Sequence, residues 1–191
     1  MFPPRPTELT WSILRGKIRE GEVVIDATAG NGHDTVFLAE CVGESGKVLA
    51  FDVQEAAIRS ARERVAKAGF APRVEFHQKS HGRMAEHAEP ESVAAVMFNL
   101  GYLPGHDHEF TTRCEETVLA LTISVGLLIP DGVLSVVCYP GHAAGLEEAS
   151  AVENWMAGRG GDGWRIARYG MLGTLRPAPF LFLAVKPSAA G

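Results

Sequence analysis

The stretch Val23-Val24-Ile25-Asp26-Ala27-Thr28-Ala29-Gly30-Asn31-Gly32-His33-Asp34-Thr35 decides the fold of this chain. A short apolar run that ends in an acid and opens through two glycines into a helical pattern predicts a strand, a tight loop and a helix. Glycine permits positive φ and close approach of a ligand to the backbone, and the free N–H groups of the helix start favour an anionic group. The stretch therefore predicts a cofactor-binding loop.

A second apolar strand, Val48 to Phe51, follows and ends at Asp52. Dinucleotide folds place the acid that binds the cofactor's ribose about 20 residues beyond the glycine loop, at the end of such a strand. We therefore predict that Asp52 binds a ribose diol. A glycine-rich turn alone is common in α/β proteins, and the second acid is what favours a cofactor site over that plainer interpretation.

Two classes of cofactor fit this arrangement. A dinucleotide site needs a third glycine, and Thr35 stands at that position. S-adenosylmethionine has an α-amino group, a carboxylate and a ribose diol, which Asp26, the 30–32 loop and Asp52 can bind in that order. We favour S-adenosylmethionine. An NAD-dependent dehydrogenase and a non-catalytic adenosine-binding regulator are the alternatives from other classes.

Composition indicates one globular domain over residues 1–191, with residues 1–6 as a lead-in and 188–191 as a tail. The chain has 191 residues, of which 46% are hydrophobic and 21% charged, enough for a three-layer core. Its net charge of -5 gives no general attraction to nucleic acid, so an RNA partner needs a local basic patch.

The three cysteines stand in apolar surroundings, as reduced thiols do, and neither a signal peptide nor a membrane-spanning run occurs. We expect a cytoplasmic protein that binds no membrane.

The rest of the pattern alternates strands and helices. Further strands are predicted at 73–77, 93–98, 133–138, 164–171 and 179–185, and further helices at 7–20, 55–68, 111–128 and 145–157. Thr7 with Glu8 is the expected cap of the first helix. Alternation followed by a closing hairpin predicts an α/β fold, with a seven-stranded, mostly parallel sheet and helices on both faces.

Loops at the carboxyl ends of parallel strands form the binding crevice of such a fold. Ser80 and His81 follow the third strand, where they are expected to meet an adenine. Asn99 follows the continuously apolar fourth strand, and Tyr139 follows the fifth. His142 either touches a substrate or caps the next helix, and the sequence leaves both roles open.

The run His106-Asp107-His108-Glu109 has the composition of a metal-binding cluster. Adjacent side chains seldom point at one ion, and no partnering pair of ligands is visible elsewhere. We therefore predict a substrate-facing loop or a helix cap at this run, and no bound metal.

Four motifs resemble the YtqB-type class I methyltransferases. They are 26–35, Phe51-Asp52-Val53-Gln54, Asn99-Leu100-Gly101-Tyr102-Leu103-Pro104-Gly105, and Tyr139-Pro140-Gly141-His142 with Gly145 and Glu147. The likeness covers about residues 7–187 and implies a Rossmann-like class I methyltransferase fold that uses S-adenosylmethionine.

The resemblance also implies a substrate. It implies methyl transfer to an amine on RNA, namely the 5-aminomethyl group of wobble 2-thiouridine in the tRNA anticodon region (nm5s2U to mnm5s2U, the MnmM activity), and it allows a homodimer. The chain departs from the family at His106, where the family has a glycine, and at 175–179. An rRNA or small-molecule N-methyltransferase is the alternative among methyltransferases.

Candidate site residues follow from the motifs and the resemblance together. The cofactor-binding candidates are Asp26, Thr28, Gly30, Asn31, Gly32, Asp34, Thr35, Asp52, Gln54, Ser80 and His81. The catalytic candidates are Asn99, Tyr102 and Asp107, and the substrate-binding candidates are Leu103, His106, His108, Tyr139 and His142. Methyl transfer to a neutral amine needs in-line placement rather than a nucleophilic side chain. Asn99 is the expected acceptor for the amine's hydrogens, with Asp107 or a nearby histidine as the proton acceptor.

Overall fold

The computed structural model describes residues 3–101 and 114–188. Its strands are β1 (Val23–Asp26), β2 (Lys47–Phe51), β3 (Val74–His77), β4 (Val93–Asn99), β5 (Leu128–Cys138), β6 (Arg165–Gly170) and β7 (Phe180–Val185). Its helices are α1 (Pro6–Arg15), α2 (His33–Cys41), α3 (Glu55–Lys67), α4 (Cys114–Leu127) and α5 (Ala143–Arg159), with short 3-10 helices η1 (Ala71–Arg73), η2 (His81–Glu86) and η3 (Gly160–Asp162).

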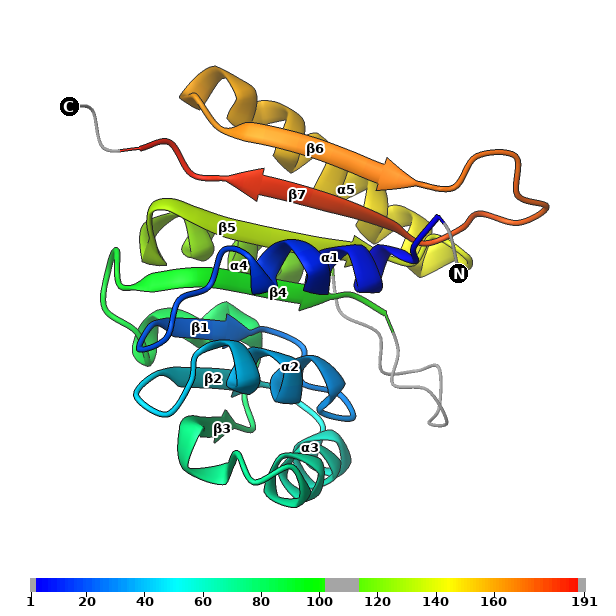
Figure 1. The fold of residues 1–191 in the computed structure, drawn as a ribbon. Coiled ribbons are helices and arrows are strands. Elements are labelled where there is room, and N and C mark those ends of the chain that lie inside the picture. Colours follow the sequence, from blue (N-terminus) through cyan, green and yellow to red (C-terminus); the bar gives the residue numbers. More distant parts are fainter. Residues whose placement is uncertain (1–2, 102–113, 189–191) are drawn as a thin grey trace.

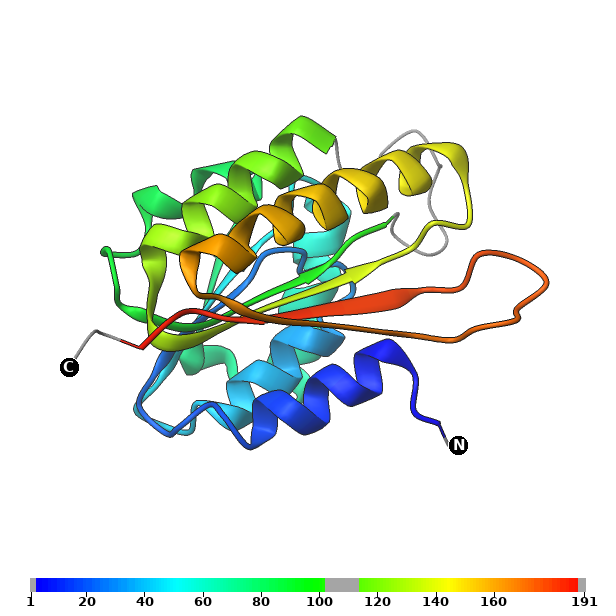
Figure 2. The same ribbon diagram turned by 90° about the horizontal axis from the view of Figure 1, so that it is seen from above.

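The described strands form one seven-stranded sheet in the order β3-β2-β1-β4-β5-β7-β6 (Figure 1). Strands β1 to β5 are parallel to one another, and β7 runs antiparallel between β5 and β6. Helices α4 and α5 cover one face and α1 and α2 the other (Figure 2). This arrangement confirms the predicted α/β fold, with its mostly parallel sheet and helices on both faces.

The core has two halves, one on each face of the sheet. In β1, Val24 packs into the half that contains Leu14 of α1, whereas Ile25 packs into the half that contains Leu121 of α4. Successive side chains of a strand point to opposite faces, so a strand covered on both faces must be apolar throughout. This requirement explains the unbroken apolar runs in β1 and β4.

The strand order places a crevice at the ends of β1 and β4. Chain connections leave β1 in one direction across the sheet, toward β2 and β3, and continue from β4 in the other. In doubly wound sheets, ligands bind where the order reverses, beyond the carboxyl ends of the strands. Asp26 ends β1 and Asn99 ends β4, so the fold brings both to this edge.

Both predicted ends of the first helix are wrong. Helix α1 begins at Pro6, inside the expected lead-in, and ends at Arg15 rather than at residue 20. Its first turn is closed by Glu8, whose carboxylate accepts a hydrogen bond of 2.9 Å from the Arg5 N–H, so Thr7 lies within the helix and not at its cap. The early end coincides with Gly16, a residue that destabilises a helix.

Strand β5 begins at Leu128, directly after α4, rather than at Val133. Asp131 and Gly132, residue types common in turns, lie inside the strand, where Asp131 has a φ of 61°. The pairing of β4 with β5 shifts register between Val93 and Ala95. The chain therefore accommodates the turn residues as an irregularity within the strand.

No helix in the described part of the chain is long and apolar enough to cross a membrane.

We expect Gly32→Ala to destabilise the fold more than Gly69→Ala. Both glycines have positive φ, 79° and 81°, so the backbone strain of an alanine is similar at each, about 1–2 kcal/mol. A Cβ at Gly32 would lie 2.7 Å from Ala61 Cα in α3, whereas a Cβ at Gly69 meets nothing within 4 Å. Overpacking should add about 1–3 kcal/mol at Gly32. Denaturant unfolding measures both variants, and equal losses would contradict the close contact of the glycine loop with α3.

Candidate active site

A cavity of about 320 Å³ opens at the carboxyl ends of the central strands. Its walls come from the glycine loop after β1 and the start of α2, from the segments after β2 and β4, and from the residue after β5. The lining residues are Thr28, Ala29, Gly30, Asn31, His33, Asp34, Asp52, Gln54, Asn99, Leu100, Gly101 and Tyr139. The cavity is thus lined by six of the predicted cofactor-binding residues together with Asn99 and Tyr139.

Asp52 is held at one end of this cavity by backbone donors. Its Oδ2 accepts a 2.9 Å hydrogen bond from the Gly30 N–H, and its Oδ1 accepts one of 2.9 Å from the Gln54 N–H. Each carboxylate oxygen has two lone pairs, so one remains on each oxygen. The carboxylate is therefore oriented by the fold and can still accept a pair of hydroxyl groups.

Asp34 joins the cavity to two other parts of the chain. Its Oδ1 accepts a 2.7 Å hydrogen bond from Trp11 Nε1 of α1, and its Oδ2 accepts one of 3.0 Å from Asn99 Nδ2. Burial raises the pKa of Asp34, while the donors from Trp11 and Asn99 oppose that rise. The carboxyl group lies in the first turn of α2, which is a favourable place for negative charge.

Asn99 is fixed by both its backbone and its amide nitrogen. Its backbone N–H donates to Thr28 Oγ1 at 2.8 Å, and Nδ2 donates to Asp34. Its buried Oδ1 accepts no hydrogen bond from the described residues. Beside it, burial and the charge of Asp34 raise the pKa of Tyr139, so the phenol stays protonated at neutral pH. The site therefore contains a positioned amide oxygen with unused acceptor capacity.

Asp26 is fully buried and lies beside the cavity rather than in its lining. Its Oδ1 accepts a 3.1 Å hydrogen bond from the Thr28 N–H and its Oδ2 one of 2.6 Å from Thr35 Oγ1. Burial first, and the nearby Asp34 second, raise the pKa of Asp26 to about 7. Asp26, Gly32 and Thr35 thus shape the glycine loop, and their direct contact with a cofactor stays a prediction.

Ser80 and His81 are engaged elsewhere and do not line the cavity. His81 is buried, with Nδ1 3.1 Å from the Ala27 carbonyl oxygen, and burial lowers its pKa. Ser80 Oγ donates to Glu116 of α4 and accepts from the Gly82 N–H. These contacts connect η2 to the loop after β1 and to α4. Contact of Ser80 and His81 with an adenine therefore stays a prediction.

His142 caps a helix. Its Nδ1 accepts a 3.0 Å hydrogen bond from the Gly145 N–H in the first turn of α5. The sequence left two roles open for His142, and the structure supports helix capping. His142 is not part of the cavity lining.

Five predicted residues lie outside the described residues: Tyr102, Leu103, His106, Asp107 and His108. Sequence reasoning in turn missed Trp11 and His33. Trp11 belongs to an apolar helical stripe that predicts only core packing. His33 stands within the deciding stretch, at the first position of α2, and its proximity to the glycine loop was the signal that could have identified it.

Asp26→Asn should change the pH dependence of stability. The pKa of Asp26 is raised from 3.8 to about 7, so the folded chain binds this proton more tightly than the unfolded chain. The resulting stabilisation is complete below about pH 4 and is lost as pH rises to about 7. The variant cannot ionise here, so its free energy of unfolding relative to the wild type should rise across pH 4 to 7, by on the order of a few kcal/mol.

Urea unfolding at a series of pH values measures this difference, with the exposed Glu44→Gln as control. A difference between Asp26→Asn and the wild type that stays constant over this range would contradict the raised pKa.

Comparison with known proteins matches this chain to one family. The family model described as "Putative rRNA methylase" matches residues 48–185. The chloroplastic tRNA (mnm(5)s(2)U34)-methyltransferase of Arabidopsis thaliana is 35% identical over 193 residues, which cover 95% of this chain and 69% of that protein.

Two crystal structures share the fold at similar identity. A putative rRNA-methylase from Clostridium thermocellum is 34% identical with a TM-score of 0.93, covering 97% of this chain and 100% of that chain. A putative methyltransferase from Streptococcus mutans, in complex with SAH, is 32% identical with a TM-score of 0.86, covering 96% and 98%. Together with the cavity at the strand ends, these matches show that the chain belongs to the rRNA methylase-like family of class I methyltransferases, enzymes that depend on S-adenosylmethionine.

Proposed function

We propose that this enzyme methylates the 5-aminomethyl group of wobble 2-thiouridine in the anticodon region of tRNA, converting nm5s2U to mnm5s2U. The observation that carries the proposal is the amide oxygen of Asn99, which is buried, fixed and available as an acceptor at the cavity. An amine that attacks a methyl group must direct its lone pair at carbon and its hydrogens at acceptors. The name of the Arabidopsis relative, a tRNA (mnm(5)s(2)U34)-methyltransferase, supports this substrate.

The cavity fits the cofactor. Asp52 offers two oriented oxygens to a ribose diol, and the glycine loop before α2 offers backbone N–H groups and positive helix-end charge to a carboxylate. Asp34, buried at the wall, suits a cationic group. When bound, S-adenosylmethionine supplies an electrophilic methyl group on a positively charged sulfur. Gly30 has a φ of 49°, a conformation that glycine adopts without the strain that an L side chain would meet.

The residues of the chain supply placement. Asn99 Oδ1 accepts an N–H of the substrate amine, while Asp34 keeps the side-chain amide from rotating and Thr28 holds the backbone N–H of the same residue. Tyr139 closes the neighbouring wall of the cavity. No nucleophilic side chain is needed, because the amine is itself the nucleophile. Burial raises the pKa of Cys138 to about 12, so this thiol is not a competing nucleophile.

The substrate side of the proposal includes residues beyond the described cavity. Tyr102 and Asp107 remain catalytic candidates, the latter as proton acceptor, and Leu103, His106 and His108 remain candidates for contact with the nucleoside. The net charge of -5 does not favour general binding to polyphosphate, which fits an enzyme that recognises a single displayed base. A homodimer and a cytoplasmic location complete the proposal, the location supported by free thiols at Cys41, Cys114 and Cys138.

An rRNA substrate is the second candidate, because the matching family is described by that activity. The two are separated by methylation assays with unmodified tRNA, tRNA bearing the wobble aminomethyl group, and ribosomal RNA. Mass spectrometry of nucleosides from a deletion strain provides the independent measurement. Loss of mnm5s2U with accumulation of nm5s2U supports the tRNA proposal, and an unchanged wobble nucleoside overturns it.

Asp52→Asn should weaken binding of S-adenosylmethionine. The amide keeps one oxygen acceptor, but it loses the charge and the second acceptor that face the ribose diol. A hydrogen bond to a charged group contributes about 1.5–3 kcal/mol, so the dissociation constant should rise about tenfold to a hundredfold. Calorimetry on the variant measures this change, with the exposed Glu63→Gln as a matched acid-to-amide control. An unchanged dissociation constant would remove Asp52 from the cofactor site.

Asn99→Ala should separate rate from affinity. Because the amide acts on the acceptor amine, cofactor affinity should change little, whereas the single-turnover rate should fall about a hundredfold, the scale of lost positioning. Single-turnover methylation of modified tRNA measures the rate constant, and a parallel measurement of cofactor binding gives the affinity. A variant that keeps the wild-type rate constant would show that Asn99 only shapes its loop.

A further inference from the structure

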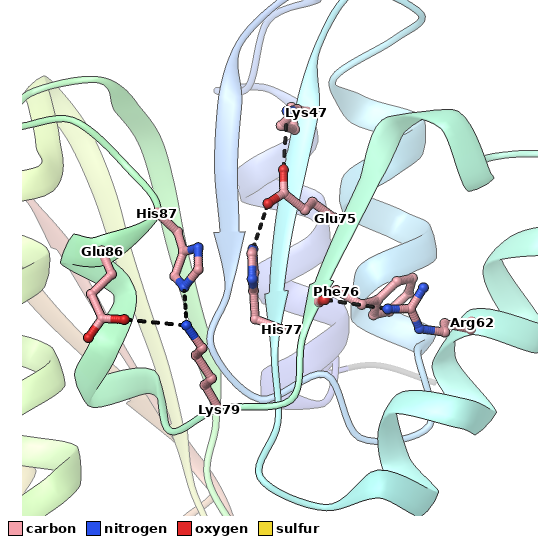
Figure 3. A network of polar contacts seen from close by, with 8 residues as sticks. All are labelled: Lys47, Arg62, Glu75, Phe76, His77, Lys79, Glu86 and His87. Carbon is pink, nitrogen blue, oxygen red and sulfur yellow. Dashed lines mark hydrogen bonds and ion pairs between the residues drawn. The ribbon is translucent and has the colours of Figure 1, made fainter.

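A cluster of possible metal ligands lies at the edge of the sheet, apart from the residues that line the cavity. Glu75 and His77 are two positions apart on the edge strand β3, so their side chains lie on the same face of the sheet. His87 follows η2 and lies beside them (Figure 3). One ligand atom of each residue can be chosen so that all three lie within 4.8 Å of one another. Carboxylate and imidazole are ligands of zinc and related transition metals.

His77 carries an unused ligand atom in this cluster. The side chain is 9% exposed, and its buried Nε2 makes no hydrogen bond with the described residues. That nitrogen lies 3.2 Å from Glu75 Oε1. Two ligands of a tetrahedral zinc ion, each about 2.0–2.1 Å from the metal, are separated by roughly 3.4 Å. The first two ligand atoms therefore already have the separation that a metal requires.

Aromatic packing holds the two imidazoles together. The ring centroids of His77 and His87 are 3.8 Å apart, and Phe51 stacks on His77 at 4.7 Å. This packing keeps both imidazole rings of the cluster in place.

The lone pairs of the cluster already attract cations. The Lys47 ammonium lies 3.2 Å from Glu75 Oε2, and the Lys79 ammonium lies 3.1 Å from His87 Nε2, as Figure 3 shows. The Lys47 and Lys79 side chains are 53% and 37% exposed, so both can turn into solvent. A metal ion bound at His87 Nε2 would replace Lys79 there, and the ligand atoms, which lie within 4.8 Å of one another, would have to move closer together.

We propose that Glu75, His77 and His87 form a binding site for a divalent transition-metal ion of the zinc type, with water as the fourth ligand. Two imidazoles and one carboxylate favour such an ion over Mg2+, which prefers oxygen ligands and keeps much of its water. None of the three residues lines the cavity. The ion would link the edge strand β3 to the segment after η2 and stabilise the folded chain by mass action.

The test is zinc binding to the full-length protein after treatment with a chelator. Calorimetry should give one high-affinity Zn2+ site per chain, Mg2+ in its place should give none, and Co2+ should produce the visible absorption bands of an ion with imidazole ligands. His87→Ala and Glu75→Gln should each weaken Zn2+ binding at least tenfold. Absence of Zn2+ binding to the wild type, or unchanged affinity in both variants, overturns the proposal.

Three further variants locate the site. His106→Ala and His108→Ala test the histidines of the run 106–109, and both should leave Zn2+ affinity unchanged. Lys79→Ala should raise the affinity severalfold, because an ammonium group no longer competes for His87 Nε2. Loss of binding in either histidine control, or weaker binding in Lys79→Ala, would contradict the site. None of these measurements depends on methyl transfer.

Discussion

The candidate site depends on one buried carboxyl group. Asp34 accepts hydrogen bonds from Trp11 on α1 and from Asn99 at the end of β4, while its own backbone belongs to the first turn of α2. Removing a carboxylate from water is costly unless donors replace the water, and hydrogen bonds to a charged group contribute about 1.5–3 kcal/mol each. The same contacts that satisfy Asp34 therefore fix the relative positions of three elements and orient the amide of Asn99.

The electrostatics of the site agree with its cofactor. Asp26 and Asp34 are both buried, and each has a raised pKa, with desolvation as the largest cause. S-adenosylmethionine carries an ammonium and a sulfonium group, and a nearby positive charge favours the ionised form of an acid. Binding of the cofactor would thus offset part of the cost of burying these carboxylates. The affinity for S-adenosylmethionine is consequently linked to the protonation of Asp26 and Asp34.

Much of the fold was predictable because its signals are local. Unbroken apolar runs identified the strands, and the acids at the end of β1 and directly after β2 predicted Asp26 and Asp52 as site residues. The strand-end rule found the edge of the sheet where the cavity lies but does not give the direction of each side chain, and Ser80 and His81 do not line the cavity. The contact between Trp11 and Asp34 spans 23 positions, and no periodic pattern encodes it. His77 and His87 likewise meet only because η2 returns the chain to the edge strand.

The beginning and the end of the described chain are joined in space. Tyr169 Oη of β6 donates a 2.7 Å hydrogen bond to the Pro4 carbonyl, 165 positions away, and Leu14 of α1 shares a core with Leu183 of β7. A ribosome releases a chain from its amino end, and domains of this size complete their packing only as the last strands emerge. During translation, part of the apolar face of α1 is thus exposed to solvent until β7 has been synthesised. For that interval the apolar residues of α1 that pack against β7 lack their partner.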